Sequence, residues 1–271
     1  MTGMTRGGQA ADIVETARLL ADAARPITLE HFRTVALPTD NKSSDGFDPV
    51  TVADRDCEAR LRELLEQHRP DDAIRGEEFG VKEGNSGVTW VIDPIDGTRG
   101  YMSGTPTWGV LIAARDASGL IYGIIDQPFT RERFEGGQGI AQYTGPTNTS
   151  PLKTRDGVGL SEAVLFTTFP EVGSAVEGQA FAEVASRAKL TRYGMDCYAY
   201  ALLALGQIDL VIEAGLQEYD ILAPIAVIEA AGGIVTDWQG GSALGGGRVV
   251  AAGSAELHAE ALAILKSVVK E

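Results

Sequence analysis

The stretch Val91-Ile92-Asp93-Pro94-Ile95-Asp96-Gly97-Thr98 carries the strongest structural and chemical signal in the chain. Its apolar start predicts a buried strand, and its proline and glycine predict a turn where the chain leaves the sheet. Asp93 and Asp96 can therefore converge on a hard cation at the end of the strand, and the Ile95 carbonyl can supply another oxygen. Gly97 lets the backbone approach a phosphate closely, while the Thr98 hydroxyl can orient a water.

An acidic turn with two solvated aspartates is the alternative interpretation of this stretch when it stands alone. Two further acidic segments argue against it, because Gly76-Glu77-Glu78 also follows an apolar stretch and Tyr219-Asp220 opens a later helix. Three acidic segments can surround one metal site. The three histidines lie far apart and there are two cysteines, so the sequence offers no compact zinc motif, and we expect a hard ion held by oxygen.

Composition limits the classes of partner. The 271 residues, 44% of them hydrophobic, suffice for one large domain or two intimate halves around a substantial core. A formal net charge of -15 repels a nucleic-acid backbone or an anionic membrane on average, so a small molecule is the expected ligand. Cys57 and Cys197 form no close-spaced pair and the start carries no long apolar segment, so we expect a cytoplasmic protein with no membrane partner.

Hydrophobic periodicity predicts helices followed by a sheet, and then alternating strands and helices. The expected elements cover residues 10–32, 54–68, 90–92, 108–114, 120–125, 163–166, 179–188, 199–205, 210–213, 221–231, 234–236, 249–250 and 255–269. The segment 136–151 is rich in glycine, proline and small polar residues and is the expected boundary. We expect an N-terminal α+β half, residues 1–145, with most metal ligands, and a C-terminal α/β half, residues 146–271, with Asp220 and the substrate pocket.

Three motifs resemble, in the same order, those of the inositol monophosphatase family: Gly76-Glu77-Glu78, Asp93-Pro94-Ile95-Asp96-Gly97-Thr98, and Tyr219-Asp220 ending at Glu229-Ala230-Ala231-Gly232-Gly233. The resemblance covers nearly the whole chain. It implies an α/β fold, a layered α/β/α/β/α sandwich, and a metal-dependent phosphoric monoester hydrolase. Family members commonly form homodimers, so a second copy of the chain is an expected partner.

The resemblance also implies a set of metal ligands, all oxygen donors: Glu77, Asp93, Ile95 through its carbonyl, Asp96 and Asp220. Asp93 would bridge two Mg²⁺ ions, and a third, weaker ion would lie near Glu77. Two Mg²⁺ ions suit this chemistry because a phosphomonoester dianion repels a nucleophile, and positive charge is needed on both the attacking and the leaving oxygen.

The expected catalytic residues are Glu77, Thr98 and Asp54, because the Asp54 segment matches the family's acidic partner for Thr98. Together they would help to activate the attacking water. The backbone amides of Gly97 and Thr98 would donate to phosphate oxygens. Lys42 matches a basic residue near the family's mobile metal loop, with a solvated loop lysine as the alternative, and residues 80–88 form either a flap over the metals or an ordinary surface turn.

Several segments resemble the histidinol-phosphatase branch of the family: Arg99-Gly100-Tyr101, residues 104–109, Asp126-Gln127-Pro128-Phe129, Arg131-Glu132-Arg133-Phe134 and residues 192–198. The resemblance implies L-histidinol phosphate as the substrate, in histidine biosynthesis. Glu213 and Asp196 would bind the alcohol portion, since carboxylates complement a cationic amine or imidazole. Without substrate, Glu213 could instead end a strand at the surface, and Asp196 could cap a turn or helix.

Two alternatives to histidinol phosphatase remain open at this point. The first is an inositol monophosphatase or a broad sugar-alcohol phosphatase, because the same metal site accepts several leaving groups. The second is a catalytically silent regulator that binds metal or phosphate. The presence of Glu77, Asp93, Asp96, Thr98 and Asp220 argues against a silent regulator.

Overall fold

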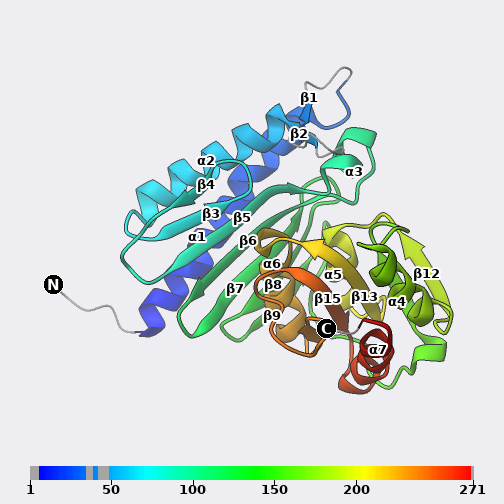
Figure 1. The fold of residues 1–271 in the computed structure, drawn as a ribbon. Helices are drawn as coiled ribbons and strands as arrows, with labels where there is room; N and C mark the ends of the chain where they lie inside the picture. The colour runs from blue at the N-terminus through cyan, green and yellow to red at the C-terminus, as the bar shows by residue number, and fades with distance from the viewer. Residues whose placement is uncertain (1–5, 35–38, 42–48, 270–271) are drawn as a thin grey trace.

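The computed structural model describes residues 6–34, 39–41 and 49–269, which form alternating layers of helix and sheet (Figure 1). The helices are α1 (Arg6–His31), α2 (Val52–His68), α3 (Thr98–Ser103), η1 (Leu160–Glu162), α4 (Ala175–Ala185), α5 (Cys197–Ala204), α6 (Glu218–Ala230) and α7 (Ala255–Val268). Helices α1 and α2 pack on the outer face of a large sheet, α5 and α6 lie between this sheet and a smaller one, and α4 and α7 cover the far side. The predicted α/β class and α/β/α/β/α layering are confirmed.

The large sheet has eight strands in the order β10-β9-β8-β7-β6-β5-β3-β4. Their bounds are β3 (Ala73–Gly76), β4 (Gly80–Lys82), β5 (Thr89–Asp96), β6 (Gly109–Asp116), β7 (Gly119–Gln127), β8 (Glu132–Gly137), β9 (Ile140–Thr144) and β10 (Thr149–Pro151). Strands β3 and β5 are parallel, and the other neighbours are antiparallel. Because β3 and β5 end at the same edge of the sheet, residues that follow Gly76 lie near those at the end of β5.

The smaller sheet has five strands in the order β12-β11-β13-β15-β14. Their bounds are β11 (Val164–Thr167), β12 (Leu190–Tyr193), β13 (Leu210–Leu216), β14 (Ile234–Thr236) and β15 (Gly247–Ala252), and a separate hairpin pairs β1 (Thr39–Asn41) with β2 (Pro49–Thr51). Strands β11 and β13 are parallel. The carboxyl ends of β11 and β13 therefore lie at the same edge of the smaller sheet, and α6 begins directly after β13.

The segment 136–151, expected as a boundary, holds strands of the large sheet instead. Gly136 lies within β8, and a Cβ on it would lie 2.3 Å from the Ala226 carbonyl oxygen of α6. The glycine therefore permits close packing of helix on sheet rather than a loop. The large sheet continues to Pro151. The predicted division of the chain into two halves between residues 145 and 146 stays a prediction.

Two other local predictions differ from the structure. Helix α4 begins at Ala175 rather than near residue 179, because Ser174 and Glu177 form a reciprocal capping box at its start. Residues 80–82, expected in a flap or turn, form strand β4. Lys42 and most of the loop that follows it lie outside the described residues.

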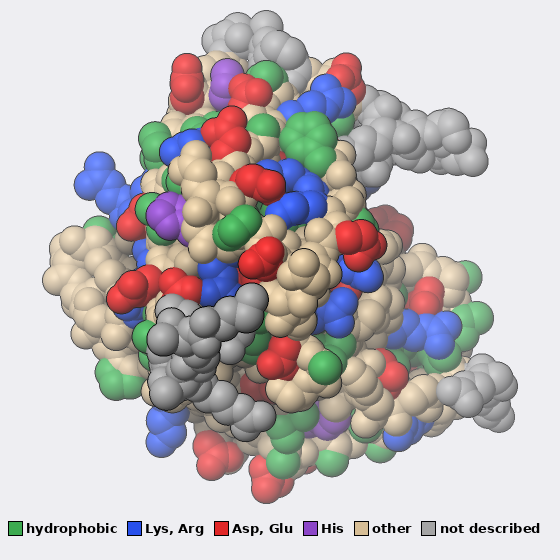
Figure 2. Space-filling model, turned by 90° about the vertical axis from the view of Figure 1, so that its left-hand side faces the viewer, with side chains coloured by type: hydrophobic (Ala, Val, Ile, Leu, Met, Phe, Trp, Pro, Cys, Tyr) green, Lys and Arg blue, Asp and Glu red, His purple; other side chains and the backbone are tan. Residues whose placement is uncertain are grey.

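The surface is charged on the face shown in Figure 2, where acidic and basic side chains are interspersed. This face presents no single-sign field to a polyanion. Within residues 6–34, 39–41 and 49–269, no helix combines the length and apolar character needed to cross a bilayer.

Candidate active site and metal centre

Three carboxylates meet where β5 ends and α6 begins. Asp93, Asp96 and Asp220 each offer an oxygen within 4.8 Å of the others. Asp93 is 1% exposed, and burial raises its pKa well above the usual range, as do the negative charges of Glu77, Asp96 and Asp220. Burial, Asp196 and Asp220 do the same to the pKa of Asp96. A cluster of this kind is stabilised by a cation, and its hard oxygen donors fit Mg²⁺.

The turn after β5 is fixed by its own hydrogen bonds. The Asp93 carboxylate accepts from the Ile95 amide at 3.0 Å, and the Thr98 hydroxyl donates to the Ile95 carbonyl at 3.2 Å. The Ile95 side chain is fully buried beside Tyr101 and Trp108. The two hydrogen bonds and the buried Ile95 side chain therefore hold this turn in one conformation.

Glu77 reaches the cluster from the turn between β3 and β4. Its charge and a hydrogen bond to Asp93 both raise the pKa of the Asp93 carboxyl, so the two side chains adjoin. Glu58 of α2 holds this turn: its buried carboxylate accepts from the Glu78 amide at 2.7 Å and the Phe79 amide at 3.1 Å. A Cβ on Gly76 would lie 2.0 Å from a Glu58 carboxylate oxygen, so glycine at this position lets the Glu58 carboxylate reach the turn.

Sequence reasoning missed Glu58, although a signal exists in the pattern. Glu58 lies four residues after Asp54 and three before Leu61, on the stripe of α2 that faces the sheet, where an apolar side chain is expected. Arg62 neutralises it through a 2.7 Å contact from Nε. A charged residue on an apolar stripe indicates a buried polar contact, here with the Glu77 turn.

Thr98 and Asp54 are brought together, as predicted. The Thr98 hydroxyl lies 3.5 Å from an Asp54 carboxylate oxygen, at the long limit for a hydrogen bond. The other Asp54 oxygen accepts from the amide and hydroxyl of Thr51 and thereby caps α2. Burial raises the pKa of Asp54 to about 6, although the bonds from Thr51 lower it. Asp54 can therefore take up a proton near neutral pH.

Asp220 lies in the first turn of α6, where one carboxylate oxygen accepts from the Gln217 amide at 2.7 Å. Two residues earlier, Glu218 joins this helix to the large sheet by contacts to Arg75 of β3 at 2.8 Å and Arg115 of β6 at 3.3 Å. Sequence reasoning missed Glu218, because its partners lie more than 100 residues away. The contacts fix the start of α6, and with it Asp220, relative to β3, which leads to Glu77, and to β6, which pairs with β5.

A cavity of about 240 Å³ opens from Asp96 and Asp220 toward the ends of β11 and β13. Asp196, Glu213 and Glu171 line it, whereas no Lys or Arg of the described chain does. Aromatic side chains supply part of the wall: Phe169 and Tyr200. The pocket is therefore acidic beyond the metal centre.

Glu213 is buried, so the alternative interpretation, a surface carboxylate at a strand end, is wrong. One of its oxygens accepts from the Thr168 amide at 2.9 Å and from the Thr168 hydroxyl, and the other accepts from the Tyr200 hydroxyl at 2.8 Å. Burial raises its pKa, while these hydrogen bonds lower it. The carboxylate is thus held in a fixed orientation at the wall of the cavity.

Asp196 precedes α5, but its side chain makes no capping hydrogen bond to that helix. Its φ of 46° lies in the left-handed region, which is strained for a non-glycine residue. Its carboxyl adjoins Gly97, where a Cβ would lie 2.9 Å from the Asp196 Cγ. Burial, followed by the charge of Glu213, raises the pKa of Asp196 to about 7, although Arg99 lowers it.

Cys197 is a packing residue at this site. Its thiol is buried next to the Gln127 amide nitrogen at 3.7 Å, and burial raises the thiol pKa well above its usual value. Its backbone amide donates to the Asp96 carboxylate at 2.6 Å. The residue therefore orients a predicted metal ligand through its backbone and is no thiolate nucleophile.

Comparison with known proteins agrees with this geometry. Residues 9–270 match the model of the inositol monophosphatase family. The chain is 41% identical to the bifunctional phosphatase IMPL2 of Arabidopsis thaliana, covering 91% of this chain and 73% of the relative. It is 33% identical to the histidinol-phosphatase of Streptomyces coelicolor, in a match that covers 94% of this chain and 97% of that relative. The solved structure of an inositol monophosphatase from Zymomonas mobilis is 35% identical, with a TM-score of 0.82. The match covers 94% of this chain and 98% of that one. The chain therefore belongs to the inositol monophosphatase family of phosphoric monoester hydrolases, as its motifs predicted.

Proposed function

We propose that this chain is a Mg²⁺-dependent histidinol-phosphatase, which hydrolyses L-histidinol phosphate to L-histidinol and phosphate. The observation that carries the proposal is the acidic cavity that extends from Asp96 and Asp220 to Asp196 and Glu213. Histidinol carries an amine and an imidazole, so its cationic groups would be stabilised by these carboxylates, whereas a neutral polyol would not. The histidinol-phosphatase name of the Streptomyces coelicolor relative supports the same substrate.

The residues of the metal centre have distinct tasks in this proposal. Glu77, Asp93, the Ile95 carbonyl, Asp96 and Asp220 would hold two or three Mg²⁺ ions. Bound there, Mg²⁺ would supply positive charge to the phosphate oxygens, acidify the attacking water and stabilise the leaving oxygen. The proposal needs no phosphorylated enzyme.

Proton transfer would pass through the Thr98 hydroxyl to Asp54. The attacking water would donate to Thr98 Oγ1, and the Thr98 hydroxyl would turn from the Ile95 carbonyl to donate to the Asp54 carboxylate 3.5 Å away. With a pKa raised to about 6 by burial, Asp54 is a stronger base than an exposed aspartate. The Glu77 carboxylate would orient the same water, and the amides of Gly97 and Thr98 would bind phosphate oxygens.

Asp196 and Glu213 would bind the leaving alcohol. Their charges repel one another, which contributes to the raised pKa of Asp196, and a cationic ligand would relieve this repulsion. Because three hydrogen bonds fix Glu213, its carboxylate would need little reorganisation on binding. The proposal retains a cytoplasmic location, a homodimer and the division into halves 1–145 and 146–271 as predictions.

The test compares kcat/KM for L-histidinol phosphate and myo-inositol 1-phosphate in Mg²⁺. We expect the histidinol ester to be preferred, and Glu213→Gln to reduce its kcat/KM about 10- to 100-fold, the effect of one lost charge-assisted contact. The inositol ester should lose less. Glu162→Gln, which removes an exposed carboxylate outside the cavity, is the control.

A preference for the inositol ester, or equal losses on both esters in Glu213→Gln, would reject the histidinol assignment. Inositol monophosphatase would then be the favoured function, in line with the Zymomonas mobilis relative. Phosphate release no greater than in a metal-free control would instead indicate a silent regulator.

A further inference from the structure

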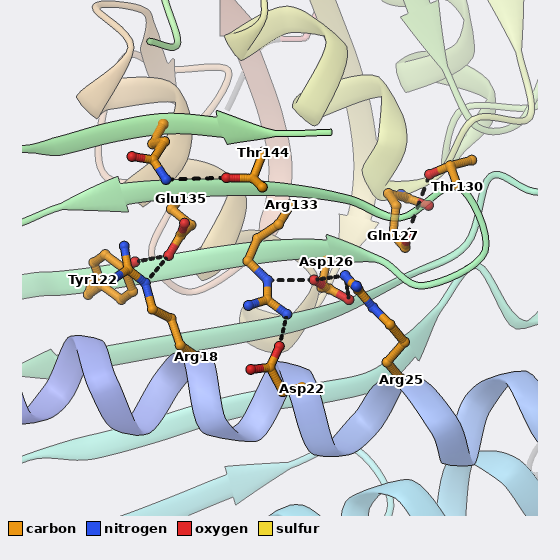
Figure 3. Close-up of polar contacts among 11 residues, drawn as sticks. Arg18, Asp22, Arg25, Tyr122, Asp126, Gln127, Thr130, Arg133, Glu135 and Thr144 are labelled. Atoms are coloured by element: carbon orange, nitrogen blue, oxygen red, sulfur yellow. Dashed lines mark hydrogen bonds and ion pairs between the residues drawn. The ribbon is translucent and has the colours of Figure 1, made fainter. Parts of the chain in front are cut away.

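A second cavity, of about 560 Å³, lies between α1 and strands β8 and β9 (Figure 3). Four arginines line it: Arg18, Arg25, Arg131 and Arg133. We call this cavity the arginine groove. None of its lining residues also lines the cavity at the metal centre. Although Arg131-Glu132-Arg133-Phe134 resembles a histidinol-phosphatase segment, its arginines face this groove rather than the predicted substrate pocket.

Buried carboxylates hold three of the arginines in place. Asp126 accepts from Arg25 at 2.9 Å and from Arg133 at 2.6 Å, and Glu135 accepts from Arg18 at 2.7 Å (Figure 3). Asp126 and Glu135 are 0% and 2% exposed, so the carboxylates are shielded from water, although the Arg18 and Arg25 side chains are 41% and 30% exposed. The arginines are therefore preorganised before any ligand binds.

The carboxylates around the groove do not balance all four of its arginines. Arg133 also contacts Asp22 at 2.7 Å, so three carboxylates balance three arginines. Arg131 is exposed and makes no hydrogen bond or ion pair to the described part of the chain. The groove thus retains one positive charge, in a chain whose net charge is -15. The overall charge disfavours anions on average, so a local excess of positive charge is a feature to explain.

The arginines of the groove also have N–H groups that no carboxylate uses. A guanidinium has five N–H groups, and these contacts use Nε of Arg18, Nη2 of Arg25 (to both oxygens of Asp126), and Nε and Nη2 of Arg133. Arg25 Nε is buried without an acceptor among the described residues. The Arg18 and Arg25 side chains are 41% and 30% exposed, so their remaining outer N–H groups are accessible to an anion in the groove.

We propose that the arginine groove is a binding site for a small phosphate-bearing anion. Several forked guanidinium groups match the multiple oxygens of a phosphate dianion, which accepts bidentate hydrogen bonds. The exposed Arg131 would bind the phosphate directly, and Arg18, Arg25 and Arg133 would supply further donors. The volume exceeds that of the 240 Å³ cavity at the metal centre, so a phosphorylated metabolite fits as well as free phosphate.

The experiment titrates inorganic phosphate and glycerol 3-phosphate into full-length protein by calorimetry in excess EDTA. Under these conditions the carboxylates at the metal centre repel phosphate, so binding reports on the groove. We expect one site in wild type, weakened about tenfold in Arg131→Gln. Asp22→Asn, which removes an opposing exposed carboxylate, should tighten binding. Arg60→Gln removes an equal charge from the exposed side of α2 and should leave it unchanged.

Tighter binding of glycerol 3-phosphate than of inorganic phosphate would identify an organic phosphate as the ligand class, and the reverse order would identify the free ion. No binding in wild type would overturn the proposal, as would binding that Arg131→Gln leaves intact or that Arg60→Gln weakens equally. Because the assay uses no metal and no turnover, its result is independent of the proposed phosphatase substrate.

Discussion

Replacing Asp93 by Asn is expected to stabilise the metal-free protein while removing its response to Mg²⁺. Asp93 lies among like charges: its oxygen is within 4.8 Å of those of Asp96 and Asp220. For unit charges about 5 Å apart, an effective dielectric constant of about 20 gives roughly 3 kcal/mol of repulsion per pair. The raised pKa of Asp93 shows that protonation already relieves part of this repulsion.

The net gain in the free energy of unfolding is therefore smaller, about 1–2 kcal/mol, which corresponds to a rise in Tm of roughly 2–8 °C for a chain of this size. Asparagine keeps the geometry, because its carbonyl oxygen can still accept from the Ile95 amide, as Asp93 does at 3.0 Å. Mg²⁺ should no longer raise the Tm appreciably, and phosphate release should collapse, because the predicted bridging carboxylate is lost.

Thermal unfolding followed by circular dichroism, in EDTA and across a Mg²⁺ titration, measures both effects. Asp126→Asn is the matched control, because Asp126 is also a buried aspartate but lies between Arg25 and Arg133. It should lose about 3 kcal/mol, since removing one partner leaves buried charge uncompensated. A natively folded Asp93→Asn protein that melts below wild type in EDTA, or that gains as much from Mg²⁺ as wild type, would refute the reasoning.

Three further predictions concern residues that position the site or respond to pH. Glu58→Ala should lower the free energy of unfolding by about 2–4 kcal/mol in urea titrations, because the turn that carries Glu77 loses two acceptors, and should weaken the Mg²⁺ response. Glu218→Gln should raise the Mg²⁺ concentration for half-maximal activity several-fold, while kcat at saturating Mg²⁺ changes little, because Asp220 is less firmly placed. Burial lowers the pKa of His258 below 6.5, so the unfolded state binds more protons and stability should fall between about pH 7 and 5. His258→Gln should flatten that fall, and an unchanged slope would contradict the assignment.

The convergence of Glu77, Asp93, Asp96 and Asp220 could be predicted from sequence because each belongs to a short motif at the end of an element. Parallel pairing of β3 with β5 brings Glu77 beside Asp93, and β13 leads directly into the helix that carries Asp220. The supporting residues were harder to predict. Glu58 acts on backbone amides 20 residues away, and Glu218 on strands more than 100 residues away, so no local pattern encodes either contact.

Glycine obscured the strands within residues 136–151, which sequence reasoning did not predict. A glycine-rich stretch indicates turns when its glycines adopt positive φ, but it indicates close packing when a helix crosses the strand. Gly123 and Gly136 belong to the second kind, because a Cβ on either would lie within 3 Å of backbone atoms of α6. Sequence alone does not distinguish glycines in turns from glycines that permit close packing, since the helix that requires Gly136 lies some 90 residues further along.

Two of the segments that resemble the histidinol-phosphatase branch, residues 192–198 and residues 131–134, lie in different places in the structure, and this separation bears on substrate assignment. Asp196 and Cys197 line the cavity at the metal centre, so that segment can act on the leaving group. Arg131 and Arg133 line the arginine groove, where they cannot contact a substrate in the catalytic cavity. Residues 192–198 therefore support histidinol phosphate as substrate, whereas residues 131–134 do not. If the groove binds phosphate while Glu213→Gln leaves substrate preference unchanged, the second segment's resemblance would reflect anion binding, and the substrate would have to be assigned without it.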